Sequence, residues 1–346
     1  MYAKAFDIQH LKTIDSWVGT AENIVLISHM NADGDACGSL LGLMHMLDKA
    51  AGKAKRISPI LPNGCPKNFE WMPGSDRILS GEKEREVCEK AIGEADLLVC
   101  ADLNNAGRID FLQDTLRQAQ GKKVLIDHHH NPATEEFDVV VSDPEISSTC
   151  ELVVWLSQAL WGDSMMDTTV ARCLYTGLRT DTGGFAFSCS QPSCFEAAAL
   201  LVQYDIEPAD IHNRIMNTFS YNRMQFYGFA INERLQIFPE QKVAMFRFSL
   251  EDQQRFGVGG EDMEGLVNYT LMMKDIEVGA LLREEKERTK VSLRAKKDVD
   301  VNKIAQQLGG GGHTKAAGAT CLCAIDQAEA EVKALLGVDG VEPMKL

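Results

Sequence analysis

The sequence has no long apolar run. No segment approaches the roughly 18 consecutive apolar residues that a membrane-spanning helix needs. The amphipathic start, MYAKAFDIQHLKTID, lacks the apolar stretch behind basic residues that characterises a signal peptide. We therefore expect a cytoplasmic protein with no membrane partner.

The sequence also lacks an excess of positive charge. Lys and Arg total 35 against 50 Asp and Glu, which gives a formal net charge of -15. Such a chain does not hold a long duplex nucleic acid through a general basic field. Either its substrate is small or a local basic pocket binds it, and part of the acidity could be carboxylate that binds cations.

A disulfide framework and internal repeats are missing as well. The ten cysteines are scattered through 346 residues, so reduced thiols are the simplest interpretation. Cys321 and Cys323 are too close together for a usual zinc pair, which favours small buried hydrophobes over a metal or redox site. With 45% hydrophobic and 25% charged residues, the composition indicates a globular protein, and its length suits two domains.

Strands and helices alternate in the first 200 or so residues. Compact apolar runs at 24–27, 97–101 and 124–126 are typical of buried parallel strands. Helices are expected at residues 7–19, 38–51, 84–93, 110–120, 149–161 and 167–178. This alternation predicts an α/β fold with a parallel sheet.

The pattern changes near residue 204, where a helical connector follows Pro208. Beyond it, strands are expected at 235–240, 242–250, 276–283 and 289–294, and helices near 261–273 and 300–308. We predict three parts: an N-terminal domain at 1–205, a helical linker at 206–225 and a smaller C-terminal α/β domain at 226–346.

The segment SHMNADGDACGS, residues 28–39, follows the first predicted strand. It places His29, Asp33 and Asp35 in a tight turn at the carboxyl end of that strand, where ligands bind in open α/β sheets. Gly34 permits a backbone conformation that other residues resist, so the two aspartates can face two neighbouring cations. A polar turn with a helix cap would explain the segment about equally well if it stood alone.

Three further polar motifs have a similar character. Asp102 follows the second of these strands, in ADLNNAGR, and Asp181 is expected in a glycine-rich loop, in GLRTDTGGFAFS. DHHHNP, residues 127–132, follows the third strand, and imidazole with carboxylate suits manganese, iron or zinc better than calcium. An Asn-rich loop, an Asx turn and an adventitious surface histidine run are the plain alternatives.

Together the four motifs predict a metal centre. Three of them end strands of one parallel sheet and would converge on one edge, which the fourth could reach. Four buried aspartates without cations would repel one another strongly. The predicted ligands, which suit two divalent cations sharing one carboxylate, are His29, Asp33, Asp35, Asp102, His128 and Asp181.

These motifs resemble those of the DHH–DHHA1 phosphoesterase superfamily. H-x-N-x-DGDAxGS, the later DHH and TDTGxF stand in the family's order, and the resemblance covers nearly the whole chain. It implies two manganese ions, or other divalent metals, bridged by Asp102. The first would be held by His29, Asp33 and Asp102, and the second by Asp35, Asp102, His128 and Asp181.

The resemblance also implies roles beside the metals. His129 would face the scissile phosphate, and Asp127 would orient the histidines. We expect His129 and Arg108 to stabilise charge on the phosphate oxygens. Ala32 stands where the family usually has proline, and His130 extends the DHH, but neither departure removes a predicted ligand.

A second candidate site lies at residues 292–318, SLRAKKDVDVNKIAQQLGGGGHTKAAG. Glycine-rich backbone can approach a phosphate closely, although a flexible linker is the alternative. GGGGHxxAAG resembles the signature of the DHHA1 substrate-binding domain. This implies an active site in an interdomain cleft, where the substrate is held by Arg294, Gly310, Gly311, Gly312 and His313, assisted by Arg283.

Within the superfamily the chain looks closest to the nano-RNase and pAp-phosphatase branch. We therefore expect a hydrolase that degrades short oligonucleotides, including pApA, and removes the 3'-phosphate of pAp by two-metal activation of water. The alternatives are an exopolyphosphatase or pyrophosphatase-like hydrolase, a RecJ-type exonuclease and a non-catalytic nucleotide-binding regulator. The sequence leaves open the preferred substrate, the polarity of digestion and homodimerisation.

Overall fold

The computed structural model describes residues 6–51 and 55–344. The chain divides into two compact units, the first ending at Asn217 and the second beginning at Thr218. The division falls inside the expected linker at 206–225, whose helix α8 (Pro208–Met216) packs as part of the first unit. Among the described residues, no helix is both long enough and apolar enough to cross a membrane.

The first unit is built on a six-stranded sheet with the order β3-β2-β1-β4-β5-β6, and every neighbouring pair is parallel. Its strands are β1 (Asn23–Ile27), β2 (Arg56–Leu61), β3 (Leu79–Ser80), β4 (Leu97–Ala101), β5 (Lys122–Asp127) and β6 (Val139–Ser142). The predicted parallel α/β sheet is confirmed. Sequence reasoning missed β2, which contains a proline, and the short β3 and β6.

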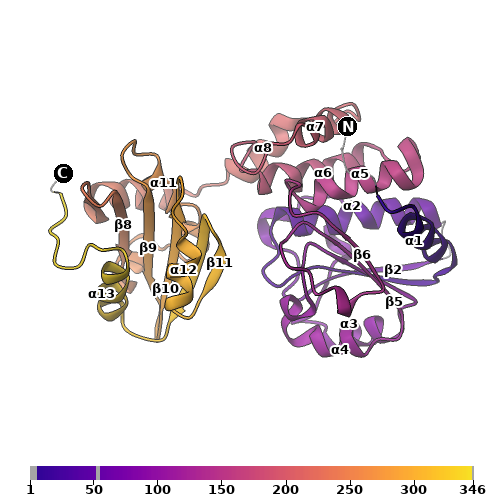
Figure 1. The fold of residues 1–346 in the computed structure, drawn as a ribbon, viewed down its shortest axis with the longest axis horizontal. Coiled ribbons are helices and arrows are strands. Elements are labelled where there is room, and N and C mark those ends of the chain that lie inside the picture. Colours follow the sequence, from indigo (N-terminus) through magenta and orange to yellow (C-terminus); the bar gives the residue numbers. More distant parts are fainter. Residues whose placement is uncertain (1–5, 52–54, 345–346) are drawn as a thin grey trace. The chain divides into compact units, whose positions relative to one another are not determined.

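Helices cover both faces of this sheet (Figure 1). Strand side chains alternate between the two layers, so that Ile24 and Leu26 join one core while Val25 and Ile27 join the other. The first layer contains α1 (Ile8–Thr20), α2 (Gly34–Ala51), α5 (Thr149–Trp161), α6 (Thr168–Asp181) and α7 (Pro192–Val202). The opposite layer contains α3 (Arg85–Gly93) and α4 (Gln113–Gln118).

Two helices extend further than the sequence predicted. Helix α2 begins at Gly34 rather than Gly38, because Asp33 Oδ1 accepts hydrogen bonds from the backbone N–H groups of Asp35 and Ala36. Helix α6 continues to Asp181 and stops before Gly183, which has a φ of 57°. Asp35 therefore lies in a helical first turn and Asp181 at a helix end, where we had expected a turn and a loop.

Glycines let α2, α5 and α6 approach one another closely. A Cβ added at Gly177 of α6 would lie 2.2 Å from Cys150 Sγ and 2.9 Å from the Cα of Asp35. A Cβ added at Gly38 of α2 would lie 2.6 Å from the carbonyl oxygen of Cys173. This close approach brings the two helix ends that carry Asp35 and Asp181 together.

The second unit is a mixed six-stranded sheet with the order β11-β12-β10-β9-β8-β7, in which only β8 and β9 are parallel neighbours. Its strands are β7 (Leu235–Phe238), β8 (Val243–Phe248), β9 (Val278–Glu284), β10 (Thr289–Ala295), β11 (Gly311–His313) and β12 (Ala316–Cys321). Its helices are α9 (Tyr221–Phe229), α10 (Leu250–Phe256), α11 (Asn268–Leu271), α12 (Val301–Gln307) and α13 (Ile325–Leu335).

The predicted hairpin and the two strands after it are confirmed in this unit. The helix predicted at 261–273 is wrong over most of its length, since only a short 3-10 turn and α11 form there. Gly265 lies between them with a φ of 80°, which interrupts helical geometry. The four glycines are not a linker, because β11 begins at Gly311 and pairs with β12.

Candidate metal centre and substrate-binding residues

The candidate metal centre lies at the carboxyl edge of the first sheet. The strand order reverses between β1 and β4, which are direct neighbours, and ligands of open α/β sheets bind at such a switch point. His29 follows β1 and Asp102 follows β4, while His128 follows the adjacent strand β5. The fold thus brings residues about 100 positions apart in the sequence to one edge.

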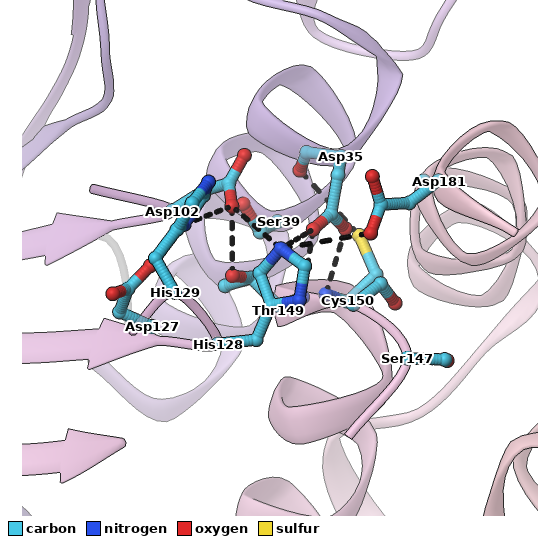
Figure 2. Close-up of polar contacts among 12 residues, drawn as sticks. Asp35, Ser39, Asp102, Asp127, His128, His129, Ser147, Thr149, Cys150 and Asp181 are labelled. Atoms are coloured by element: carbon cyan, nitrogen blue, oxygen red, sulfur yellow. Dashed lines mark hydrogen bonds and ion pairs between the residues drawn. The ribbon is translucent and has the colours of Figure 1, made fainter. Parts of the chain in front are cut away.

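The structure gathers the six predicted ligands into one cluster, and Figure 2 shows four of them side by side. His29 Nε2 lies 3.4 Å from Asp102 Oδ2. His128 Nε2 lies 3.6 Å from Asp102 Oδ1, 3.5 Å from Asp181 Oδ2 and 3.9 Å from Asp35 Oδ2. Asp102 therefore turns one oxygen toward His29 and the other toward His128, as a carboxylate shared by two cations requires.

Three groups of side chains offer ligand atoms within 4.8 Å of one another. They are His29 with Asp33 and Asp102, Asp35 with His128 and Asp181, and Asp102 with His128 and His129. Carboxylate mixed with imidazole is a donor set for transition-metal dications rather than for calcium. The residues present therefore fit a divalent metal site.

Hydrogen bonds fix the direction of several of these side chains. His29 Nδ1 bonds to the carbonyl oxygen of Met30 at 2.9 Å, so Nε2 is the atom turned toward Asp102. His129 Nδ1 lies 2.7 Å from Asp127 Oδ1. The other Asp127 oxygen is buried and has no hydrogen-bond partner among the described residues.

The electrostatics of the cluster indicate that it is built for added positive charge. Burial, together with the charges of Asp102, Asp181 and Asp33, raises the pKa of Asp35 well above its usual value. Burial, only partly opposed by His128, raises the pKa of Asp181 to about 6. Mutually repelling carboxylates in a buried site favour bound cations.

His29 and Asp102 behave as an ion pair within this cluster. Burial alone would raise the pKa of Asp102, but the hydrogen bond to His29 and the charges of His128 and His29 lower it. Burial on its own would lower the pKa of His29, but the hydrogen bond to Asp102 and the negative charges of Asp102 and Asp33 together raise it. A cation bound by His29 must displace its proton, so metal affinity here depends on pH.

Arg108 lies beside this pair and not in it. Its carbonyl oxygen accepts the backbone N–H of Met30 at 2.8 Å, which joins the loops that follow β1 and β4. Its positive charge acts on His29 by lowering the pKa of the imidazole. The half-buried Arg108 thus lies close enough to the cluster to act on it electrostatically.

The substrate-binding residues predicted in the second unit lie on β10, β11 and β12. Arg294 pairs with Ala316 across β10 and β12, and His313 pairs with Ala316 across β11 and β12. Directly opposed residues share a face, so Arg294 and His313 flank one small side chain. Gly310 and Gly312 pack directly on β12, where an added Cβ would lie 2.1 and 2.6 Å from carbonyl oxygens.

Arg283 differs from Arg294 in having an internal partner. Its Nη2 lies 2.8 Å from Glu285 Oε1, and its guanidinium fills the space beside Gly260. Among the described residues, Arg294 hydrogen-bonds through Nη1 to the carbonyl oxygen of Leu293 alone, and burial lowers its pKa. Arg294 is thus the stronger candidate for an anionic ligand.

Sequence reasoning missed the contribution of helix α5 to the metal centre. The backbone N–H groups of Thr149 and Cys150 donate to the two carboxylate oxygens of Asp35, at 2.7 and 2.8 Å. The motif SSTCE signals a helix start, since Ser148 caps α5 by accepting the N–H of Glu151. Nothing in that local pattern indicates the partner 114 positions away.

Comparison with known proteins agrees with this arrangement. Residues 23–178 match the DHH family, N-terminal domain, and residues 241–337 match the DHHA1 domain. The chain is 30% identical over 312 residues to a Thermus thermophilus protein named bifunctional oligoribonuclease and PAP phosphatase NrnA, covering 86% of this chain and 83% of that protein. The protein of the same name from Bacillus subtilis is 27% identical over 304 residues, covering 86% and 89%.

A solved structure resembles the whole chain. It is described as an exopolyphosphatase-related protein from Bacteroides fragilis, and it is 34% identical with a TM-score of 0.93 over 97% of both chains. The chain belongs to the DHH/DHHA1 phosphoesterase family. It is a metal-dependent phosphoesterase with a divalent metal site of the DHH type.

Proposed function

We propose that this phosphoesterase uses manganese to hydrolyse very short oligonucleotides, including pApA, to mononucleotides and to remove the 3'-phosphate of pAp. One observation carries the proposal: six ligand side chains converge with Asp102 between two groups. The relatives named as oligoribonuclease and PAP phosphatase, which match over most of their length, support this substrate class.

The chain supplies the ligands for two cations. His29, Asp33 and Asp102 would hold one, and Asp35, Asp102, His128 and Asp181 would hold the other. Two such cations, when bound, supply a nucleophilic water near neutral pH and offset charge on the phosphoryl oxygens. The mixed imidazole and carboxylate donors support manganese as the metal, with other divalent transition metals as alternatives.

Two side chains beside the ligands, those of His129 and Arg108, act on the substrate itself. Asp127 accepts the hydrogen bond from His129 Nδ1 and so orients that ring toward the scissile phosphate. Arg108 contributes positive charge next to His29, where negative charge develops on the phosphate oxygens during hydrolysis. The His129 ring is held by Asp127 before the substrate arrives, which limits the reorganisation that the reaction requires.

The second unit binds the part of the substrate that is not cleaved. Arg294 is half-buried, and in the described part of the chain its guanidinium hydrogen-bonds to a backbone carbonyl alone, so a phosphate is a favourable partner for it. His313 on the other side of Ala316 adds a second polar contact. The net charge of -15 favours substrates with few phosphates over long strands.

Inorganic polyphosphate is the second candidate substrate. The Bacteroides fragilis protein, described as exopolyphosphatase-related, is the specific observation in its favour. A two-metal site hydrolyses phosphoanhydrides by the same chemistry as phosphate esters. Only the groups that bind the rest of the substrate distinguish the two functions.

Turnover on a matched panel tests the proposal. The panel contains pAp, pApA, a five-nucleotide RNA, long single-stranded DNA, pyrophosphate and polyphosphate, each with manganese. We expect AMP from pAp and pApA, slower cleavage of the RNA, and almost none of the other three. Asp102→Ala, assayed in parallel, should abolish turnover because it removes the shared ligand. Cleavage of polyphosphate alone would transfer the function to the second candidate.

A further inference from the structure

Thr149 contacts two predicted metal ligands that come from different elements. It is the first residue of α5 and is fully buried. Its backbone N–H donates to Asp35 Oδ2 at 2.7 Å, and its hydroxyl Oγ1 donates to Asp102 Oδ1 at 2.9 Å. Figure 2 shows Thr149 beside Asp35 and Asp102.

The hydroxyl contact determines how the Asp102 carboxylate is turned. Oδ1 receives the Thr149 hydroxyl and lies 3.6 Å from His128 Nε2, while Oδ2 faces His29 at 3.4 Å. A carboxylate rotates easily about its terminal bond, so an added donor on one oxygen selects one orientation. In that orientation the two oxygens face the two ligand groups.

The backbone contact holds Asp35 in the same way. The N-terminus of a helix offers N–H donors and partial positive charge, and α5 directs both toward this carboxylate. Each carboxylate oxygen has a second lone pair that stays available to a cation. Asp35 therefore remains a metal ligand while its position is fixed from behind.

The turn before α5 is itself held rigidly. Glu151 is fully buried and accepts hydrogen bonds from the backbone N–H of Ser147 at 3.1 Å and from Trp155 Nε1 at 3.3 Å. Ser148 caps the helix through Glu151 N at 3.0 Å. Thr149 thus starts from a fixed backbone, and its β-branched side chain has few rotamers.

We propose that Thr149 is a positioning residue of the metal centre, which sets the separation of Asp35 and Asp102 and turns Asp102 so that it can serve two cations. The inference rests on the proposed assignment of Asp102 as the shared ligand, but not on the identity of the substrate. Removal of the hydroxyl should weaken the binding of the cations, since loss of a hydrogen-bond partner behind a ligand typically costs about 10–100-fold in metal affinity.

Thr149→Val tests this inference because it keeps the shape and the backbone N–H and removes only the hydroxyl. Manganese binding is measured by titration calorimetry and by the electron paramagnetic resonance signal of free manganese. We expect the two-site affinity to fall about 10–100-fold, and turnover to recover at high manganese. Thr149→Ser, which restores the donor, should bind like the wild type.

A matched control is Thr289→Val, which removes a fully buried threonine hydroxyl that bonds to the carbonyl oxygen of Cys323 in the second unit. It should leave manganese affinity unchanged. Wild-type affinity in a folded Thr149→Val variant would overturn the inference. If that variant does not fold, Thr149→Ala removes the same hydroxyl without placing a second methyl group against Asp102, and wild-type affinity in that variant would likewise overturn the inference. Failure of the substrate panel with intact manganese binding would count only against the proposed function.

Discussion

Asp127 is a buried residue that orients a histidine beside the metal ligands. It is fully buried, and its Oδ1 holds His129 Nδ1 at 2.7 Å, while Oδ2 has no partner among the described residues. The buried carboxylate thus orients the histidine that we assign to the scissile phosphate. Figure 2 shows Asp127 beside His129.

Asp127→Asn should lower kcat by about 10–100-fold, because the amide no longer accepts from Nδ1 in the same way and the ring loses its orientation. Manganese stoichiometry should stay at the wild-type value, since Asp127 is not among the proposed ligands. Steady-state kinetics on pApA at saturating manganese measures the effect. His130→Asn is the matched control and should be nearly neutral, since the carbonyl oxygen through which His130 accepts a hydrogen bond from Asn104 Nδ2 is unchanged by the substitution. Equal losses in the two variants would rule out a specific role for Asp127.

At the scale of elements, the decisive feature is the contact between α2, α5 and α6. Each of these helices brings a part of the metal centre: Asp35 on α2, the N–H donors on α5 and Asp181 on α6. Gly177 makes the contact possible, because a Cβ there would overlap Cys150 Sγ and approach the Cα of Asp35. Packing and site geometry therefore depend on the same residue.

Gly177→Ala should destabilise the first unit by about 1–3 kcal/mol, the usual cost of overpacking, and should weaken manganese binding by moving Asp35. Gly19→Ala in α1 is the control, because nothing lies within 4 Å of its added Cβ. That variant should gain up to about 1 kcal/mol. Urea denaturation of the metal-free proteins measures the change in the free energy of unfolding of each variant. Similar stability of the two variants would mean that α6 can move away from α2 without loss.

At the scale of the whole molecule, the proposed metal ligands and the proposed substrate-binding residues lie in different units. All the proposed metal ligands lie in the first unit, whereas Arg294 and His313 lie in the second. Each unit has hydrophobic cores of its own. We therefore expect the first unit to bind metal without the second unit, and the second unit to be needed for recognition of the rest of the substrate.

A fragment that ends at Asn217 should fold and bind manganese with the affinity of the full chain. Its turnover of pApA should fall about 10–100-fold or more, since each lost charge-assisted contact is worth about 1.5–3 kcal/mol. Calorimetry and steady-state assays measure the two properties on the same sample, with Arg294→Gln in the full chain as comparison. Full activity of the fragment would exclude a role for the second unit in catalysis.

The sequence alone determined three strands beside the metal centre and the residues that we propose as its ligands. His29, Asp102 and His128 each follow a short apolar run, and such a run can be recognised from neighbouring residues of the sequence alone. The four motifs were also sufficient to identify the family. The ends of α2 and α6 were predicted wrongly, because the Asp33 cap and the hydrogen bond from the Thr182 backbone N–H to the carbonyl oxygen of Leu178 extend these helices beyond their apolar pattern.

The tertiary structure alone decided which groups support the ligands. The order β2-β1-β4 puts His29 beside Asp102, and the glycine contacts bring Asp35 against α5. Thr149 lies 114 positions from Asp35 and 47 from Asp102 in the sequence. Hydrogen bonds over such separations depend on how strands and helices pack, and no periodicity or spacing of the chain records them.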